Sequence, residues 1–470
     1  MTDLAFVPAV EQARMVRDKE VSPVELVDLY LARIEKYDGE INAYVTVAAD
    51  QAREQAVKAE QQVIDGEELG PFHGVPIPIK DLFETKGIKT TFSCRALADL
   101  VPDQDDNVVV KIKQAGAIVI GKTNTSEFGS VPMTESQLNG ITRNPWDHDV
   151  TAGGSSGGAA AAVAAGLAPV AQGSDGGGSI RVPASCCGLF GLKPSRGRIS
   201  AGPRLGEHWH GFSTSGALGH TVTDVAALID VMCGYMTGDP YSAPTPDRPF
   251  VQEVGTDPGK LRIGFTSKSP NELDVHPDCL EALDSAAKLL DSLGHEVLEA
   301  EPATWVDQSL QPHFVQLIST GTAVLDFLPH DQLEPLNRYL VESARQIDST
   351  THIQALLAMH QWTRQVCSWW EDFDILLTPT TALPPVRNGW VFSDDDPFMA
   401  LVRSGQFIPF TPALNVTGQP AASVPLHRNA QGLPIGIQIV GGPYRDDLVV
   451  RLAAQLEEAS PWARSHPEMP

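Results

Sequence analysis

The sequence predicts a layered α/β fold, with helices packed on a largely parallel β-sheet. Segments typical of strands and of helices alternate along the chain, and residues 261–300 have the pattern of a strand–helix–strand unit. Such a unit has a right-handed crossover. The chain has 470 residues, of which 42% are hydrophobic and 20% charged, so it can bury a large core and has the composition of a globular protein.

The chain begins with helical patterns. Residues 8–36 are predicted to be helical. Within them, Ser22 can cap a helix that has Pro23 at its first position and Glu25 at its third. Residues 48–64, rich in Ala, Glu, Gln and Lys, predict a second helix.

The pattern changes near residue 70. Residues 70–81 contain three prolines and cannot form an ordinary helix, so we expect an extended segment that ends at Lys80. A helix is predicted at 108–114 and a buried strand at 117–121. Residues 123–150 form a long polar loop, and loops of this kind commonly carry function.

The alternation continues to the end of the chain, without a repeat of fixed period. The predicted elements are a strand end followed by a helix capped at Thr223 within 218–233, a strand at 261–265, a helix at 277–293 stopped by Gly294, a strand at 295–300, mainly helices over 302–375, a strand at 374–379, a strand at 435–440 and a helix at 447–458.

Composition excludes several classes of function. The net charge of −25 opposes general binding to nucleic acid or to an anionic membrane, which both need clustered Lys and Arg. The six cysteines lack the paired spacing of a zinc site and are too few for a disulfide scaffold. No secretory signal and no membrane-spanning stretch is evident. We therefore expect a cytoplasmic monomer or homodimer with a small-molecule substrate.

Two turns rich in glycine and serine stand out in residues 152–181. They are Gly-Gly-Ser-Ser-Gly-Gly at 153–158 and Gly-Gly-Gly-Ser at 176–179, with a helix-favouring alanine run at 159–165 between them. A flexible linker would not border such a helix. Neither turn ends as a phosphate loop does. The first turn matches Gly-x-Ser-x-Gly, but residues 144–151 before it have the pattern of a loop, not of the strand that a nucleophile elbow requires.

Ser179 is the stronger candidate for a nucleophile. It follows three glycines and precedes a predicted helix start near Pro183. Successive backbone N–H groups from Gly176 to Ser179 can form an anion-holding nest, which the oxyanion of an attacked amide requires. A serine at this position still needs a base.

Four motifs together resemble the amidase signature family. They are Pro-x-x-x-Lys-Asp at 76–81, the turn at 153–158, Gly-Ser-Asp-x-Gly-Gly-Ser-Ile-Arg-x-Pro-Ala at 173–184 and Gly-Leu-Lys-Pro at 191–194. Weaker similarity covers nearly the whole chain, including 409–412 and 415–420. The resemblance implies one amidase domain over 1–470, with a central mixed β-sheet covered by helices on both sides. Residues 60–200 would form its signature core and 205–410 its substrate-selecting region.

The resemblance implies a Ser–cis-Ser–Lys triad. Ser179 would be the acyl nucleophile, Ser155 a bridging serine behind a cis peptide bond, and Lys80 the base. A lysine acts as a base only when it is neutral, so burial must lower its pKa. The apolar, proline-rich segment before Lys80 is consistent with such burial.

The resemblance also implies supporting residues. Asp175 and Arg181 match family positions that brace the nucleophile loop, and Ser156 would cap its helix or add a hydrogen bond. Many relatives have Thr or Ile at position 176, and the glycine here resembles the branch with 6-aminohexanoate-cyclic-dimer hydrolases and broad-specificity amidases. The oxyanion hole would be formed by the backbone N–H groups of Gly176, Gly177, Gly178 and Ser179.

Candidate substrate contacts are the loop with Met133 and the aromatic residues of 302–410, since apolar side chains line ligand pockets. Core packing explains these aromatics equally well. His208 and His210, on either side of Trp209, suggest a metal site, but no third ligand has suitable spacing. We expect a pair on the surface or at the rim of the pocket, and neither a metal nor a cofactor.

These observations predict a serine amidohydrolase. It would cleave carboxylic amides, and esters or carbamates of similar shape, through an acyl-enzyme. Two alternatives stay open: an A-type subunit of glutamyl-tRNA amidotransferase, which has the same triad but works in a complex that handles tRNA, and a binding protein that keeps the fold without catalysis. The negative charge and Gly176 count against the first alternative.

Overall fold

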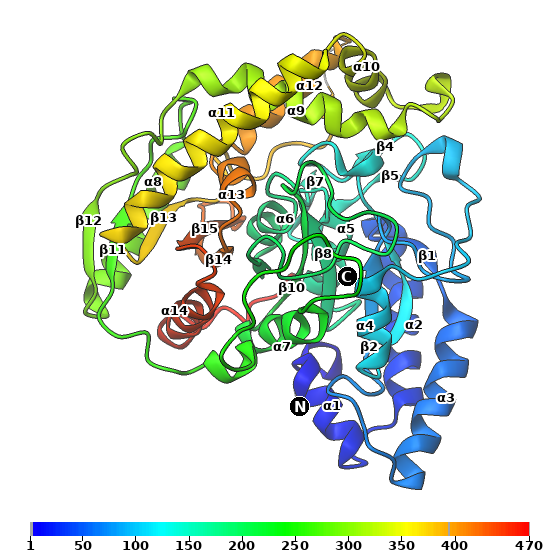
Figure 1. Ribbon diagram of the computed structural model, residues 1–470. Coiled ribbons are helices and arrows are strands. Elements are labelled where there is room, and N and C mark those ends of the chain that lie inside the picture. Colours follow the sequence, from blue (N-terminus) through cyan, green and yellow to red (C-terminus); the bar gives the residue numbers. More distant parts are fainter. Residues whose placement is uncertain (1–2, 393–394, 470) are drawn as a thin grey trace.

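The fold is built on an eight-stranded sheet, seen in a computed structural model that describes residues 3–392 and 395–469 (Figure 1). The strand order is β12-β11-β13-β15-β14-β9-β10-β8. The bounds are β8 (Val170–Asp175), β9 (Phe190–Lys193), β10 (Thr214–Gly219), β11 (Arg262–Phe265), β12 (Glu296–Glu299), β13 (Ile375–Pro379), β14 (Ala421–Arg428) and β15 (Pro434–Gly441).

The sheet is mixed, as the resemblance implied, but it is not largely parallel. Only β11 pairs in parallel, with β12 and β13, while the other neighbouring pairs run antiparallel. The parallel pair β11–β12 is the predicted strand–helix–strand unit. The prediction of a largely parallel sheet was wrong because β8, β9 and β14 were not recognised and only the end of β10 was, and antiparallel neighbours need no crossover helix between them.

A smaller sheet carries Lys80. It has the order β1-β3-β2, with β1 (Tyr44–Val47), β2 (Pro76–Lys80) and β3 (Ile118–Thr123). The predicted extended segment is therefore a strand, and its last residue lies against the large sheet. The backbone N–H of Lys80 donates to Gln172 Oε1 of β8 at 3.1 Å. The two sheets thus meet at the end of β2.

The N-terminal helices are close to those predicted, except that residues 8–36 do not form one helix. Lys19 has a left-handed φ of 60°, and the chain turns there before α2 begins. The predicted capping box of Ser22 and Glu25 is present. The bounds are α1 (Ala9–Arg17), α2 (Pro23–Ile41), α3 (Ala49–Asp65) and α4 (Asn107–Gln114).

Helices cover both faces of the large sheet. In β13, Ile375 and Leu377 join a core with α7 (Val222–Met232), α8 (Pro277–Ser292) and α14 (Asp446–Ala459). Leu376 joins another core with α11 (Ser349–Cys367) and α13 (Thr411–Thr417). Alternate side chains of a strand point to opposite faces, so a continuous apolar run marks a strand buried on both sides.

The cap of α7 differs from the prediction, whereas the helices of residues 302–375 agree with it. Thr221, not Thr223, caps α7, since its side chain accepts the backbone N–H of Asp224 at 3.1 Å. The predicted helical character of 302–375 is confirmed, and its helices gather with α12 above one end of the sheet in Figure 1. The remaining bounds are α5 (Gly157–Ala164), α6 (Arg181–Cys187), α9 (Gln311–Thr322), α10 (Pro335–Ala344) and α12 (Pro397–Phe407).

The segment 123–150 is not wholly loop. It holds two small ribbons, β4 (Glu135–Ser136) with β5 (Gly140–Ile141), and β6 (Arg143–Asn144) with β7 (Asp147–Thr151). Residues 144–151, expected as loop, therefore include a strand that leads toward the first glycine-serine turn. That strand lies outside the large sheet, so this turn still differs from a nucleophile elbow.

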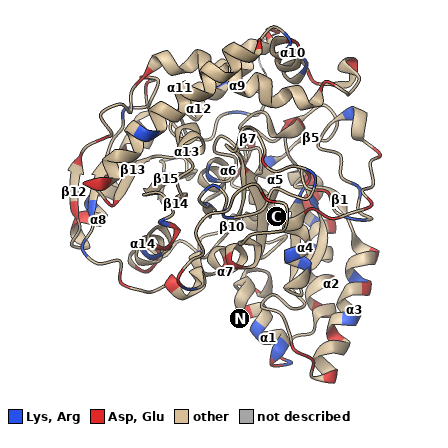
Figure 2. Cartoon of the chain, in the orientation of Figure 1, with Lys and Arg blue, Asp and Glu red and all other residues tan. Residues whose placement is uncertain are grey.

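Charged side chains lie mainly on the outside. In the view of Figure 2, basic and acidic residues are interspersed along outer helices such as α1 and α3, and the basic ones do not gather in one patch. No described helix has the length and apolar character needed to cross a membrane.

Candidate active site

The buried ammonium group of Lys80 lies beside two serine hydroxyls. Its Nζ donates to Ser155 Oγ at 2.8 Å and to Ser174 Oγ at 3.1 Å. Burial lowers the pKa of Lys80 to about 7, although the charge of Asp175 opposes this shift. A lysine with this pKa is partly neutral at neutral pH and can accept a proton.

Ser155 lies in the turn before α5, and its side chain is buried. The Gly154–Ser155 peptide bond is cis, as the resemblance implied. A Cβ atom on Gly154 would lie 2.4 Å from the backbone carbonyl carbon of Met133, so only glycine fits this approach. The turn therefore packs directly against the loop that precedes it.

Ser156 joins the two glycine-serine turns. Its backbone N–H donates to Ser179 O at 3.2 Å, and its Oγ donates to Ser174 O at 3.1 Å. Its side chain makes no capping hydrogen bond to α5. Of the two predicted roles, the structure therefore favours the added hydrogen bond.

Ser179 stands between β8 and α6, and it is 9% exposed. The N–H of Gly178 donates to Asp175 Oδ1 at 2.7 Å, so this predicted oxyanion donor already has a partner inside the protein. No described group accepts a hydrogen bond from the N–H groups of Gly176, Gly177 or Ser179. These three donors remain available to a ligand.

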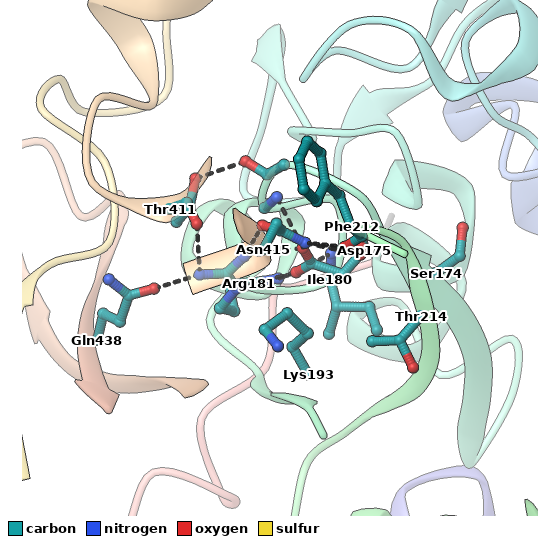
Figure 3. Close-up of polar contacts among 12 residues, drawn as sticks. Ser174, Asp175, Ile180, Arg181, Lys193, Phe212, Thr214, Thr411, Asn415 and Gln438 are labelled. Carbon is teal, nitrogen blue, oxygen red and sulfur yellow. Dashed lines mark hydrogen bonds and ion pairs between the residues drawn. The ribbon is translucent and has the colours of Figure 1, made fainter. Parts of the chain in front are cut away.

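A buried ion pair braces this turn (Figure 3). Arg181 contacts Asp175 through Nη2 to Oδ1 at 2.8 Å and Nε to Oδ2 at 2.9 Å, and both side chains are fully buried. Burial alone would raise the pKa of Asp175, but the charge and hydrogen bonds of Arg181 outweigh it and hold that pKa well below its usual range. Asp175 therefore stays charged beside the guanidinium group, as a brace requires.

Four further residues that hydrogen-bond this network or Lys80 were given no role from the sequence. Arg181 donates to Thr411 O, Gln438 Oε1 and Asn415 Oδ1, and Asn415 Nδ2 donates back to Asp175 Oδ1 at 2.9 Å. Thr411 and Asn415 lie in the segments of weaker family similarity, which was the available signal. Ser174 stands beside Asp175 in the strongest motif. Gln438 had no signal beyond its place in a predicted strand.

Ser179, Gly176 and Gly177 line a cavity of about 400 Å³. This volume suits a small organic molecule. Aromatic residues of the predicted substrate-selecting region also line it: Trp209, Trp305, Phe314, Trp362 and Phe398. Trp305 and Trp362 also belong to a buried core, so these two residues both pack in the core and line the cavity.

The structure places Met133 behind the cavity wall. Residues 129–132 line the cavity, whereas Met133 is 1% exposed and packs in a cluster with Val131 and Val182. Its contact with substrate stays a prediction. A second, shallow hollow lies near Arg143 and Arg387 and contains no residue of the predicted triad.

The pair His208 and His210 does not join other ligands. Among residues 3–392 and 395–469, no three His, Cys, Asp or Glu side chains are grouped as a metal site would require. His210 Nε2 lies 3.1 Å from Leu317 O, and burial lowers the pKa of His208. Trp209, between them, lines the cavity.

Comparison with known proteins identifies the family. The amidase family model matches residues 25–450. The 6-aminohexanoate-cyclic-dimer hydrolase of Paenarthrobacter ureafaciens is 36% identical over 483 aligned residues, which cover 98% of this chain and 96% of that protein. The chain belongs to the amidase signature family. It is an amidase, a hydrolase that acts on amides.

Solved structures share the whole fold of this amidase. A 6-aminohexanoate cyclic dimer hydrolase in complex with its substrate superimposes with a TM-score of 0.93 at 34% identity, covering 99% of each chain. A bacterial aryl acylamidase of the amidase signature family superimposes with a TM-score of 0.89 at 29% identity, covering 98% of this chain and 97% of the other.

Proposed function

We propose that this amidase cleaves its substrate through an acyl-enzyme on Ser179, with Ser155 and Lys80 as the proton relay. The observation that carries the proposal is the contact of Lys80 Nζ with Ser155 Oγ at 2.8 Å, made by a lysine whose pKa is about 7. A neutral lysine beside a hydroxyl can activate a serine nucleophile.

The relay moves protons in both directions. Lys80 takes the proton of Ser155 as Ser155 takes that of Ser179, and Ser179 Oγ forms a bond to the amide carbonyl carbon. When the tetrahedral intermediate collapses, the C–N bond breaks and the leaving amine receives the proton through Ser155. Water then attacks the acyl-enzyme by the same route, which releases the acid and restores Ser179.

The oxyanion is held by backbone N–H groups of the second turn. Gly176, Gly177 and Ser179 supply the donors, while Gly178 uses its N–H to bind Asp175. The ion pair of Asp175 with Arg181 holds the turn in the geometry that these donors need. Of the four oxyanion donors expected from the resemblance, three therefore remain in this proposal.

The substrates are carboxylic amides of small molecules. Two relatives support this: one is named for hydrolysis of a cyclic dimer of 6-aminohexanoate and another as an aryl acylamidase. The site is formed within one chain, so we propose that the free chain hydrolyses simple amides without a partner subunit.

The test uses the purified chain with a panel of alkanoyl 4-nitroanilides. We expect hydrolysis by the wild type, and an acylated peptide containing Ser179 in mass spectra of quenched reactions. Ser179→Ala should lose both, whereas Ser292→Ala, an exposed serine at the end of α8, should keep both. Hydrolysis that persists in Ser179→Ala would overturn the assignment, and absence of hydrolysis by the wild type would favour a binding protein or a partner-dependent subunit.

A further inference from the structure

Among mostly apolar residues, the cavity lining includes the polar residues Asn271, Asp307 and Gln311. Asn271 and Asp307 line the cavity beside aromatic residues such as Phe314. The backbone N–H of Asp307 donates to Pro270 O at 3.1 Å. The two segments that carry these side chains are therefore joined, next to Asn271, and their polar groups belong to the same part of the wall.

Both side chains present an oxygen that no described donor uses. Asn271 Oδ1 is buried and has no hydrogen-bond partner among residues 3–392 and 395–469. Asp307 Oδ1 accepts from the backbone N–H and the hydroxyl of Ser309, at 3.0 and 2.6 Å, but no described group donates to Oδ2. Asn271 Oδ1 is a buried acceptor of a residue that lines the cavity, and such acceptors in native proteins are normally satisfied, so its lack of a partner indicates a donor on the ligand. Asp307 is only partly buried, and its Oδ2 can accept a second donor at the same place.

The charge of Asp307 indicates which kind of hydrogen-bond donor the ligand carries. It is the one charged side chain among the described residues that line the cavity, and no described Lys, Arg or His forms an ion pair with it. A carboxylate next to apolar walls binds an ammonium group more strongly than a neutral N–H. The faces of nearby aromatic rings also favour a cation.

We infer that the cavity takes amides that carry an ammonium group several bonds from the scissile carbonyl. Asp307 and Asn271 Oδ1 receive the ammonium group, and the apolar walls receive the spacer. Cleavage of such a substrate rests on the proposed function of Ser179. Asp307 and Asn271 are specificity-determining residues and take no part in bond breaking.

The test compares substrate pairs in which a terminal methyl group replaces the ammonium group. Aminoalkanoyl 4-nitroanilides of increasing length place the amine on the acyl side, and N-(aminoalkyl)benzamides place it on the leaving side. We expect the wild type to prefer the amine in at least one series by about tenfold in kcat/KM, the size of one hydrogen bond to a charged group.

Variants of the cavity residues test which side chains cause the preference for the amine-bearing substrate. Asp307→Asn should abolish it, because the amide can still accept from Ser309 but carries no charge. Asn271→Leu should reduce it. Asp274→Asn, an exposed acid of the same loop that does not line the cavity, is the matched control and should keep it. A wild type without preference in both series, or a preference that survives in Asp307→Asn, would overturn the inference.

A binding measurement distinguishes failure of this inference from failure of the proposed function. Calorimetry with Ser179→Ala should show tighter binding of the amine-bearing member of the pair, without turnover. If Ser179→Ala still hydrolysed its substrates, the proposed function would fail while the preference in binding stood. If it neither hydrolysed nor discriminated, the inference alone would fail.

Discussion

Lys80 and Arg181 are both fully buried cations of the signature region, but their surroundings are opposite. Arg181 meets the carboxylate of Asp175 through two hydrogen bonds and has three further acceptors. Among the described residues, Lys80 Nζ hydrogen-bonds only the hydroxyls of Ser155 and Ser174. The cation that is paired with a carboxylate holds the turn in place. The uncompensated one loses its proton near neutral pH and is available for chemistry.

Lys193 is a second buried lysine of the signature region with a lowered pKa. It is buried, and burial together with the charge of Arg181 lowers its pKa to about 7, as for Lys80. Its Nζ donates to the backbone oxygen of Pro194 at 3.0 Å and makes no hydrogen bond to a serine of the described residues. The difference between the two lysines is therefore one of contact with a hydroxyl, which only the folded chain decides.

The largest expected effect is the loss of the uncompensated cation. Lys80→Met should lower kcat/KM for a 4-nitroanilide by about 10⁴-fold, the order of loss seen when one member of a catalytic triad is removed. Its free energy of unfolding should not fall, because a buried ammonium group is replaced by an apolar chain of similar length. Kinetics and urea unfolding of the same preparation measure both. Full activity at neutral pH would remove Lys80 from the relay.

Arg181→Met should lower the free energy of unfolding, which Lys80→Met should not. It leaves the carboxylate of Asp175 buried without its cation, which costs about 3–5 kcal/mol in the free energy of unfolding. Arg204→Met is the matched control, because Arg204 pairs with Glu84 at the surface and is 53% exposed. We expect the control to lose less than about 1 kcal/mol in urea unfolding. Similar losses in both variants would contradict the role of a brace.

The pH dependence reports on Lys80 in two ways. The neutral lysine is the active form, so kcat/KM should rise by about tenfold per pH unit below pH 7 and level off above it. For stability, the folded pKa of about 7 lies below the ordinary value of 10.5, so the unfolded chain binds more protons between these two pH values. The free energy of unfolding attributable to Lys80 should therefore rise with pH in that window.

Comparison of the wild type with Lys80→Met isolates that contribution. The difference in their free energies of unfolding should shrink steadily from pH 7 toward pH 10. A difference independent of pH would show that Lys80 keeps its ordinary pKa. An acid limb of kcat/KM far from pH 7 would point to the same conclusion.

The smallest expected effect is the difference in stability between alanine substitutions at two neighbouring glycines of the second turn. Gly178 has a φ of 125°, and a Cβ atom there would lie 2.3 Å from Thr411 Oγ1, whereas a Cβ atom on Gly177 meets nothing within 4 Å. Gly178→Ala should therefore cost about 1–3 kcal/mol of stability, and Gly177→Ala less than about 0.5 kcal/mol. Thermal unfolding of the pair measures this. Equal stability would mean that the turn can move away from Thr411.

Much of the fold and of the site could be predicted from short stretches of sequence. The capping box of Ser22 and Glu25, the extended segment ending at Lys80 and the strand–helix–strand unit near residue 261 are all present. They depend on hydrogen bonds and side-chain periodicity between residues close in the chain. The antiparallel strands β8, β9 and β14 were missed, and only the end of β10 was predicted, because their pairing partners lie far away in sequence. The single-domain organisation and the cytoplasmic location stay predictions.

The sequence by itself determined which residues are proposed to carry the chemistry, since the motifs around Lys80, Ser155 and Ser179 are dense and specific. Only the tertiary structure decided how they work together. It brings Lys80 to Ser155 across 75 residues, places a carboxylate against Arg181 but not against Lys80, and uses the N–H of Gly178 to hold Asp175. The physical reason is that burial and charge compensation arise from groups that meet only when the whole chain has folded.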